Sequence, residues 1–279
     1  MVFLKNAELA EGHADQKHKG RDVFLGDQVK DQDFNFAIFD DLGSAPPTME
    51  AARALDAVSL FPGYEQQQSD ATSAYTQSFL RGKPTWISLP RERWPKSWEG
   101  KYTNPVVRLM LSLYGHPDAG TYWEQDCARH VKVAGFEEID GWTSVFWHPV
   151  KKALLIVYVD DFNLACPSQH TAGIWSDLRK NIKMDDPGPP GRFLGCYREK
   201  FEVKASCDPI TKILSNNPEL HLRGADKPTP LNLKNPDRKV KGYSYDMTKY
   251  TEENVRKYLD LVGVPIGRLR PADTPFLDE

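Results

Sequence analysis

The stretch of sequence that decides the fold is Ala153-Leu-Leu-Ile-Val-Tyr-Val-Asp-Asp-Phe-Asn-Leu-Ala-Cys166. Seven apolar residues end in the adjacent carboxylates Asp160 and Asp161, and a second, mostly apolar run follows at once. Leu, Ile, Val and Tyr favour strands, and runs this short fit buried strands better than helices. The stretch therefore predicts a strand, a tight turn with the two aspartates at its tip, and a second strand.

Two adjacent carboxylates at the end of a buried strand repel each other, and desolvation strengthens that repulsion. A bound divalent cation would relieve it, and so would exposure of the turn to water. The doublet alone is weak evidence, because the 24 Asp residues form three Asp-Asp pairs where chance predicts about two. Only Asp160 and Asp161 lie between two apolar, strand-like runs, so their context is the informative feature.

The composition is that of an ordinary globular protein. Hydrophobic residues make up 40% and charged residues 27% of 279 positions. No apolar run approaches the roughly 20 residues that span a bilayer, and residues 1–5 lack a signal-peptide core, so we expect neither membrane association nor secretion. Four cysteines without Cys-x-x-Cys spacing favour free thiols over a zinc site. The net charge of −3 argues mildly against a general nucleic-acid binder, although a channel can still be basic.

The predicted elements mix helices with hairpins, which favours an α+β fold over a doubly wound one. Thr48 is a predicted N-cap, and Thr251 is another. A strand over 65–70 is expected to turn helical over 74–80, with Asp70 at the transition, where an Asp often serves only as a cap. The main helices are predicted over 49–58, 121–134, 168–182 and 251–263.

Asp70 and the Asp160–Asp161 doublet are 90 residues apart, so two folded segments can bring them together. Three carboxylates around two Mg²⁺ ions are the arrangement that in-line nucleotidyl transfer needs. Mg²⁺ prefers hard oxygen ligands, which Asp provides.

Five ordered motifs resemble the reverse transcriptases of copia-type retrotransposons. Tyr158-Val-Asp-Asp161 is similar to their Tyr-x-Asp-Asp motif, and Asp70, with Tyr75 five residues later, is similar to their first catalytic motif. The other three resembling elements are Lys19-Gly-Arg-Asp-Val23, Ser112-Leu-Tyr-Gly115 with Trp123 following, and Arg192-Phe-Leu-Gly195. The motifs occur in the family's order and cover roughly residues 17–200.

The resemblance implies a role for each matching position. Asp70, Asp160 and Asp161 would be the catalytic ligands of two Mg²⁺ ions, which Mn²⁺ could replace. Tyr75 would be a steric gate beneath the incoming sugar. The implied contacts to the triphosphate, nucleotide and template come from Lys19, Arg21, Gly115 and Tyr158, and the implied primer grip is Phe193, Leu194 and Gly195. The implied partners are an RNA or DNA template-primer, dNTPs and other parts of a Pol polyprotein.

The implied fold is a right-hand polymerase whose palm sheet carries the Tyr-Val-Asp-Asp hairpin. Residues 1–62 would be fingers-like, 63–200 the palm with interleaved fingers elements, and 201–279 a thumb or connection. The implied location is the cytoplasm, in virus-like particles, or the nucleus.

The sequence also departs from the family pattern. His116-Pro-Asp-Ala-Gly120 replaces the usual Leu-Lys-Gln continuation, and Ala71 replaces a larger apolar residue. Two alternatives to an active polymerase therefore stay open. One is a decayed remnant that only binds nucleic acid, and the other is a structural or partner-binding domain whose aspartate doublet is a solvated turn.

Overall fold

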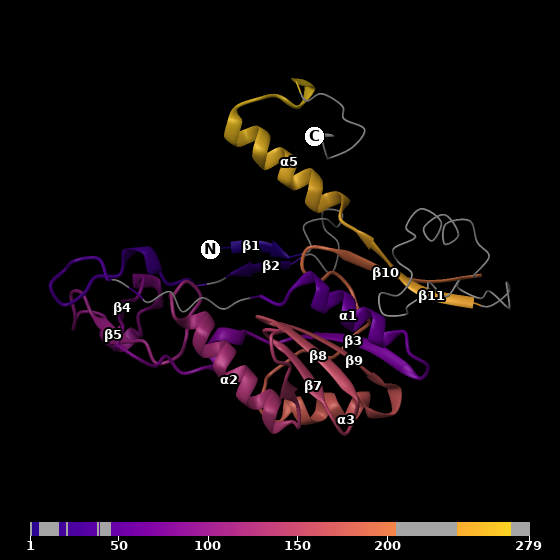
Figure 1. Cartoon of the computed structure of the whole chain (residues 1–279). Helices are drawn as coiled ribbons and strands as arrows, with labels where there is room; N and C mark the ends of the chain where they lie inside the picture. Colours follow the sequence, from indigo (N-terminus) through magenta and orange to yellow (C-terminus); the bar gives the residue numbers. More distant parts are fainter. Residues whose placement is uncertain are drawn as a thin grey trace. The chain divides into compact units, whose positions relative to one another are not determined.

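The computed structural model describes residues 2–5, 17–20, 22–37, 39, 46–204 and 239–268 (Figure 1). The chain divides into two compact units, Met1–Gly188 and Pro189–Glu279. The described residues form a mixed α+β structure, as the element pattern predicts.

The first unit is built on a five-stranded antiparallel sheet. Its strand order is β3-β9-β8-β7-β6, and all neighbouring strands are antiparallel. The predicted strand–turn–strand is confirmed as the central hairpin of this sheet, and every residue of β8 except the last is buried. The strands are β3 (Tyr64–Asp70), β6 (Glu137–Glu138), β7 (Val145–His148), β8 (Ala153–Tyr158) and β9 (Asp161–Pro167).

Helices cover both faces of this sheet, and Figure 1 shows α1 and α3 on opposite sides of it. One face packs against α2 (Ala119–Val133) and α3 (Ser168–Arg179). Its core includes Leu155, Val157, Phe162, Leu164, Trp123 and Trp175. On the other face, α1 (Met49–Ser59) contacts β3, β8 and β9. Side chains alternate between faces along a strand, so a sheet covered on both sides needs the near-continuous apolar run found in β8.

Local sequence signals set several element ends. The Thr48 side chain accepts a hydrogen bond from the Ala51 amide, so the predicted N-cap of α1 is confirmed. The helix predicted over 74–80 is instead a short 3-10 turn, η2 (Ala74–Gln77), which follows Ser73 in a left-handed conformation.

Two further strands, β4 (Trp86–Ser88) and β5 (Val106–Arg108), pair with each other. Between β4 and β5 lie two 3-10 turns, η3 (Arg91–Arg93) and η4 (Lys96–Trp98), and a third, η1 (Gly26–Gln28), comes earlier in the chain. Near the N-terminus, β1 (Val2–Lys5) pairs with β2 (Lys17–Gly20).

The second unit contains one antiparallel strand pair and one long helix. β10 (Tyr197–Lys204) pairs with β11 (Lys239–Asp246), and α5 (Thr248–Val262) is followed by η6 (Ile266–Arg268). The prediction that Thr251 caps α5 is wrong, because the helix begins at Thr248, whose amide bonds to the Asp246 carboxylate. Gly263 ends it at φ +65°, as predicted.

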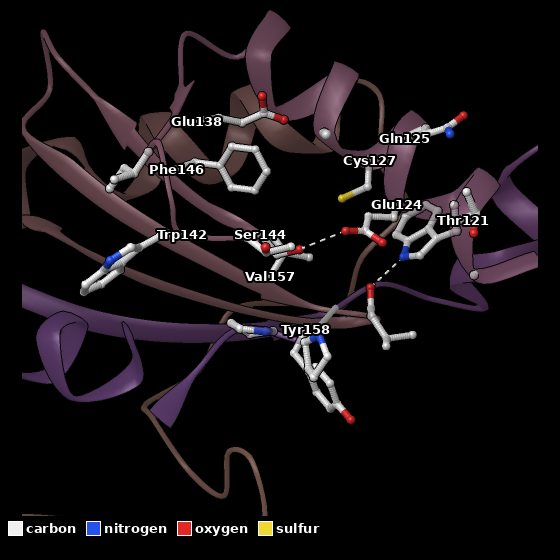
Figure 2. Close-up of a pocket in the computed structure, with 18 of the residues that line it drawn as sticks. Thr121, Glu124, Gln125, Cys127, Glu138, Trp142, Ser144, Phe146, Val157 and Tyr158 are labelled. Carbon is white, nitrogen blue, oxygen red and sulfur yellow. Dashed lines mark hydrogen bonds between the residues drawn. The ribbon is translucent and has the colours of Figure 1, made fainter. Parts of the chain in front are cut away.

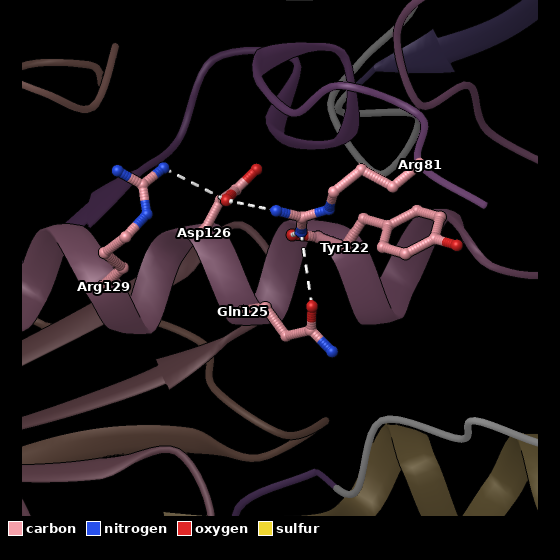
Figure 3. Close-up of polar contacts among 5 residues, drawn as sticks. All are labelled: Arg81, Tyr122, Gln125, Asp126 and Arg129. Carbon is pink, nitrogen blue, oxygen red and sulfur yellow. Dashed lines mark hydrogen bonds and ion pairs between the residues drawn. The ribbon is translucent and has the colours of Figure 1, made fainter.

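A polar cluster joins the segment after η2 to α2. Figure 3 shows the Arg81 guanidinium between Asp126 and Gln125 of α2. Arg81 and Arg129 each lie 3.1 Å from the same Asp126 oxygen. Burial alone would raise the pKa of Asp126, but the hydrogen bond from Arg129 and the charge of Arg81 together lower that pKa. The cluster therefore holds the chain that follows Asp70 and η2 against α2.

Within the described part of the chain, none of the helices has both the length and the apolar character needed to cross a bilayer.

A second ion-pair cluster joins the β7–β8 turn to α3. Lys151 of that turn lies 2.8 Å from the Asp177 carboxylate, and Lys180 lies 2.7 Å from it. Hydrogen bonds from these two lysines lower the pKa of Asp177 to about 2. The cluster fixes the end of the hairpin that lies opposite the aspartate doublet.

We expect the pH dependence of the free energy of unfolding to report the ion pairs of Asp177. Because the folded state lowers the pKa, Asp177 contributes stability above its unfolded pKa of 3.8 and loses that contribution as the pH falls toward about 2. The carboxylate is partly exposed, so the contribution is on the order of 0.5–1 kcal/mol. Asp177→Asn should remove this part of the pH dependence of chemical denaturation, and the exposed-site control Asp140→Asn should retain it. Identical pH profiles for the two variants would contradict the assignment.

Candidate active site

The three predicted catalytic aspartates meet at one end of the sheet. In the β3–β9 register, Asp70 is directly opposite Asp161, so their side chains emerge from the same face. The Ala71 amide donates a 2.7 Å hydrogen bond to the Asp160 carbonyl. Asp70 is exposed, and Asp160 and Asp161 are partly exposed. Two segments 90 residues apart in sequence therefore present three carboxylates at an accessible strand end.

The sequence predicts that both Asp160 and Asp161 lie at the tip of the turn, but only Asp160 does. Tyr158 pairs with Asp161, so the two-residue loop is Val159 and Asp160, and Asp161 is the first residue of β9. Val159 has φ +55°, a left-handed conformation that glycine favours and β-branched residues avoid. Holding a valine there costs about 1–3 kcal/mol. The Trp123 indole N–H donates a 2.6 Å hydrogen bond to the Val159 carbonyl.

Tyr75 lies beside this turn, on η2. Its ring centroid is 4.6 Å from that of Tyr114, and the ring is partly buried. Burial, and then the nearby Tyr114, Asp160 and Tyr158, raise the pKa of the Tyr75 hydroxyl. Tyr75 and Tyr158 thus both adjoin Asp160, and the predicted sugar-gate role of Tyr75 stays a prediction.

Gly115 has a structural reason to be glycine. Its φ is +91°, and a Cβ there would overlap the carbonyl oxygen of Phe24. The Phe24 amide also donates a 2.7 Å hydrogen bond to the Tyr114 carbonyl. The apolar run Val23-Phe-Leu25 favours a short strand, but in the structure it is irregular chain held against the Tyr114–Gly115 backbone. The predicted role of Gly115 in nucleotide or template binding stays a prediction.

The altered turn after Gly115 is organised by His116, which sequence reasoning did not single out. The ring is 5% exposed, and its Nδ1 accepts a hydrogen bond from the Asp118 amide. Its Nε2 lies 3.2 Å from the Thr85 hydroxyl, so the neutral tautomer protonated at Nε2 satisfies both contacts. Burial lowers the pKa of His116, against an opposing effect of Asp118. The departure from the family pattern therefore has its own packed arrangement.

Other predicted site residues lie elsewhere. The backbone of Lys19 pairs with Phe3 in the β1–β2 pair; the Lys19 side chain and all of Arg21 lie outside the described residues. Phe193, Leu194 and Gly195 belong to the second unit. Phe193 is buried and exchanges both backbone hydrogen bonds with Cys196 around a tight turn, in which Leu194 and Gly195 have positive φ.

A cavity of about 720 Å³ adjoins the hairpin tip on the α2 side. Figure 2 shows residues from α2, from β8 and from the chain around Trp142 lining it. The Ser144 hydroxyl donates a 3.4 Å hydrogen bond to Glu124, and burial raises the pKa of that carboxyl. No motif in the sequence marks Glu124 or Ser144, because their meeting depends on how α2 packs on the sheet.

The carboxylates have the donor chemistry of a magnesium site, since Asp oxygens are the hard ligands that Mg²⁺ prefers. Asp70 and Asp161 are paired across two strands, and the backbone of Asp160 bonds to the residue after Asp70. Across the described residues, no group of three or more His, Cys, Asp or Glu side chains is gathered closely enough to hold a metal ion. The donor chemistry of Asp70, Asp160 and Asp161 fits the ion.

Comparison with known proteins assigns no family. No protein-family model matches the sequence, and no curated protein matches it. The arrangement of Asp70, Asp160, Asp161 and Tyr75 is therefore the basis for a functional proposal.

We expect Gly115→Ala to destabilise the protein by roughly 2 kcal/mol or more, because it forces a side chain into a positive φ and against the Phe24 carbonyl. Gly173→Ala is the matched control. Gly173 is an exposed helical glycine with open space around its Cβ position, so this change should stabilise by about 0.5–1 kcal/mol. Urea denaturation of both variants tests the pair, and a neutral Gly115→Ala would show that the close backbone contact is absent.

Proposed function

We propose that this chain is an RNA-directed DNA polymerase of the copia type, acting by two-metal nucleotidyl transfer from dNTPs to a primer 3′ end. The observation that carries the proposal is the convergence of Asp70 with Asp160 and Asp161 at one sheet end. The five motifs in family order support it independently of the geometry.

In this proposal Asp70, Asp160 and Asp161 hold two Mg²⁺ ions, or Mn²⁺ in their place. When bound, the ions supply activation of the primer hydroxyl and neutralisation of charge on the triphosphate. Asp70 and Asp161 are partners across the strand pair, and like charges at that spacing repel each other unless a cation neutralises them. Asp70 is exposed, and Asp160 and Asp161 are partly exposed, so the proposed site is accessible from solvent.

Tyr75 is the proposed sugar gate. Its position beside Asp160 and its packing against Tyr114 give a fixed aromatic surface next to the reacting end of the site. A rigid ring at that place would exclude a ribose 2′-hydroxyl on steric grounds. Tyr158 and Gly115 are proposed to border the same nucleotide position.

The segment from Arg81 to Arg108 supports a nucleic-acid partner. It carries seven Lys and Arg residues and two Glu residues, in a chain whose net charge is −3. Half-buried Trp98 packs edge-to-face with Trp94 and with exposed Tyr102, and the Arg91 guanidinium lies 5.9 Å from the Trp94 ring. Cations beside aromatic rings suit phosphates and unpaired bases.

A second candidate is a remnant that binds nucleic acid without extending it. The packed His116 turn favours this candidate, because it replaces the family's polar Lys and Gln with a buried ring and an adjacent Asp118. The basic segment would serve binding in either case. Primer extension separates the two candidates.

The decisive assay is primer extension by the full chain on an RNA template with Mg²⁺ or Mn²⁺. We expect Asp160→Asn to reduce extension on the order of 10²–10³-fold or more while thermal unfolding is unchanged. Asp177→Asn is the control, since its partner Lys151 is in the turn at the other end of β8. Salt-sensitive template binding without extension by the wild type would select the remnant, and full activity of Asp160→Asn would refute the mechanism.

A further inference from the structure

We propose that Trp123 is a positioning residue for the catalytic turn, acting through the hydrogen bond from its indole N–H to the Val159 carbonyl. This inference rests on the proposed function for its effect on catalysis. Its structural part, that Trp123 holds the turn in place, stands on the contacts of the turn alone.

The turn needs a restraint from outside itself. Val159 is the first residue of a two-residue hairpin loop and has φ +55°, where glycine is the usual occupant. Its branched side chain disfavours this conformation, so the local backbone preference pulls the turn away from the observed geometry. Such strained residues persist only where their surroundings fix them.

Two neighbouring elements supply that restraint by holding consecutive carbonyls. Trp123 of α2 bonds to the Val159 carbonyl at 2.6 Å, and the Ala71 amide bonds to the Asp160 carbonyl at 2.7 Å. Ala71 directly follows Asp70. The two peptide groups that flank the Asp160 Cα are thereby tied to α2 on one side and to the residue after Asp70 on the other.

Trp123 is itself immobilised. The residue is 3% exposed and belongs to the core cluster that also contains Val157 and Phe162, which flank the turn in sequence. Because the indole is fixed in the core, its hydrogen bond holds the Val159 carbonyl at a set position relative to α2. A phenylalanine would keep most of the apolar packing but would leave that carbonyl without its indole donor.

The chain contains a matched control. Trp175 on α3 is 2% exposed, lies in the same core cluster, and donates its indole N–H to the Gln67 side chain at 2.9 Å. Gln67 is three residues from Asp70, and its partner across the strand pair is Leu164. Trp175→Phe removes an equivalent buried indole and hydrogen bond without touching the turn.

We expect Trp123→Phe to lower kcat for primer extension about tenfold, the effect of one lost buried hydrogen bond, with a smaller change in KM for dNTP. Trp175→Phe should stay within about twofold of wild type. Adding Val159→Gly, which tolerates the positive φ without a restraint, should recover most of the loss in Trp123→Phe. Additive effects of Trp123→Phe and Val159→Gly would mean that Trp123 only packs the core.

Amide hydrogen exchange of the segment 157–162 tests the structural part without any activity. We expect exchange about tenfold faster than wild type in Trp123→Phe and unchanged in Trp175→Phe. Equal exchange in the two variants would overturn the inference. A different result would separate the two proposals. If exchange is faster in Trp123→Phe but not in Trp175→Phe, and the wild type does not extend primers, then Trp123 positions the turn and the polymerase proposal is refuted.

Discussion

The register of β3 against β9 is the constraint on which the rest of the structure depends. It places Asp70 opposite Asp161 and, on the other face, Gln67 where the Trp175 indole can bond to it. Because side chains alternate along a strand, a slip of one residue would move Asp70 to the face that packs on α2 and α3. Strand β3 is polar except for Tyr64, and its Gln66 and Ser69 side chains bond to Asp56 and to the Asp185 carbonyl, so polar contacts help to fix which carboxylates face each other.

Rigid packing on one side of the sheet end is combined with access on the other. The turn at Val159 and Asp160 is strained and is held by α2 and by Ala71, the residue after β3, whereas Asp70 is exposed to solvent. Backbone strain tends to gather at functional sites, where the surroundings determine a geometry that the local sequence would not choose. Nearby in sequence, the Tyr75 ring packs against Tyr114, and the His116 ring bonds to the Thr85 hydroxyl.

Local pattern was sufficient to predict the α+β class, the central hairpin and the Thr48 cap, since each depends on neighbouring residues. It failed where distant segments decide. Residues 74–80 have helical composition, but the left-handed Ser73 leads into only a short 3-10 turn. Residues 23–25 are apolar, yet they bond to Tyr114 instead of pairing as a strand. The motifs indicated that Asp70 and Asp160 meet, but the Trp123 and Glu124 contacts depend on the packing of α2 and leave no local signal.

The central claim is that the aspartates of the two strands act on the same cation. Electron paramagnetic resonance titration of the 279-residue chain with Mn²⁺ tests it most directly, on wild type, Asp70→Asn, Asp161→Asn and the double variant. We expect each single substitution to weaken Mn²⁺ binding nearly as much as the double substitution, because the paired carboxylates share an ion. Independent, additive losses, or a wild type that binds Mn²⁺ no better than the double variant, would contradict it.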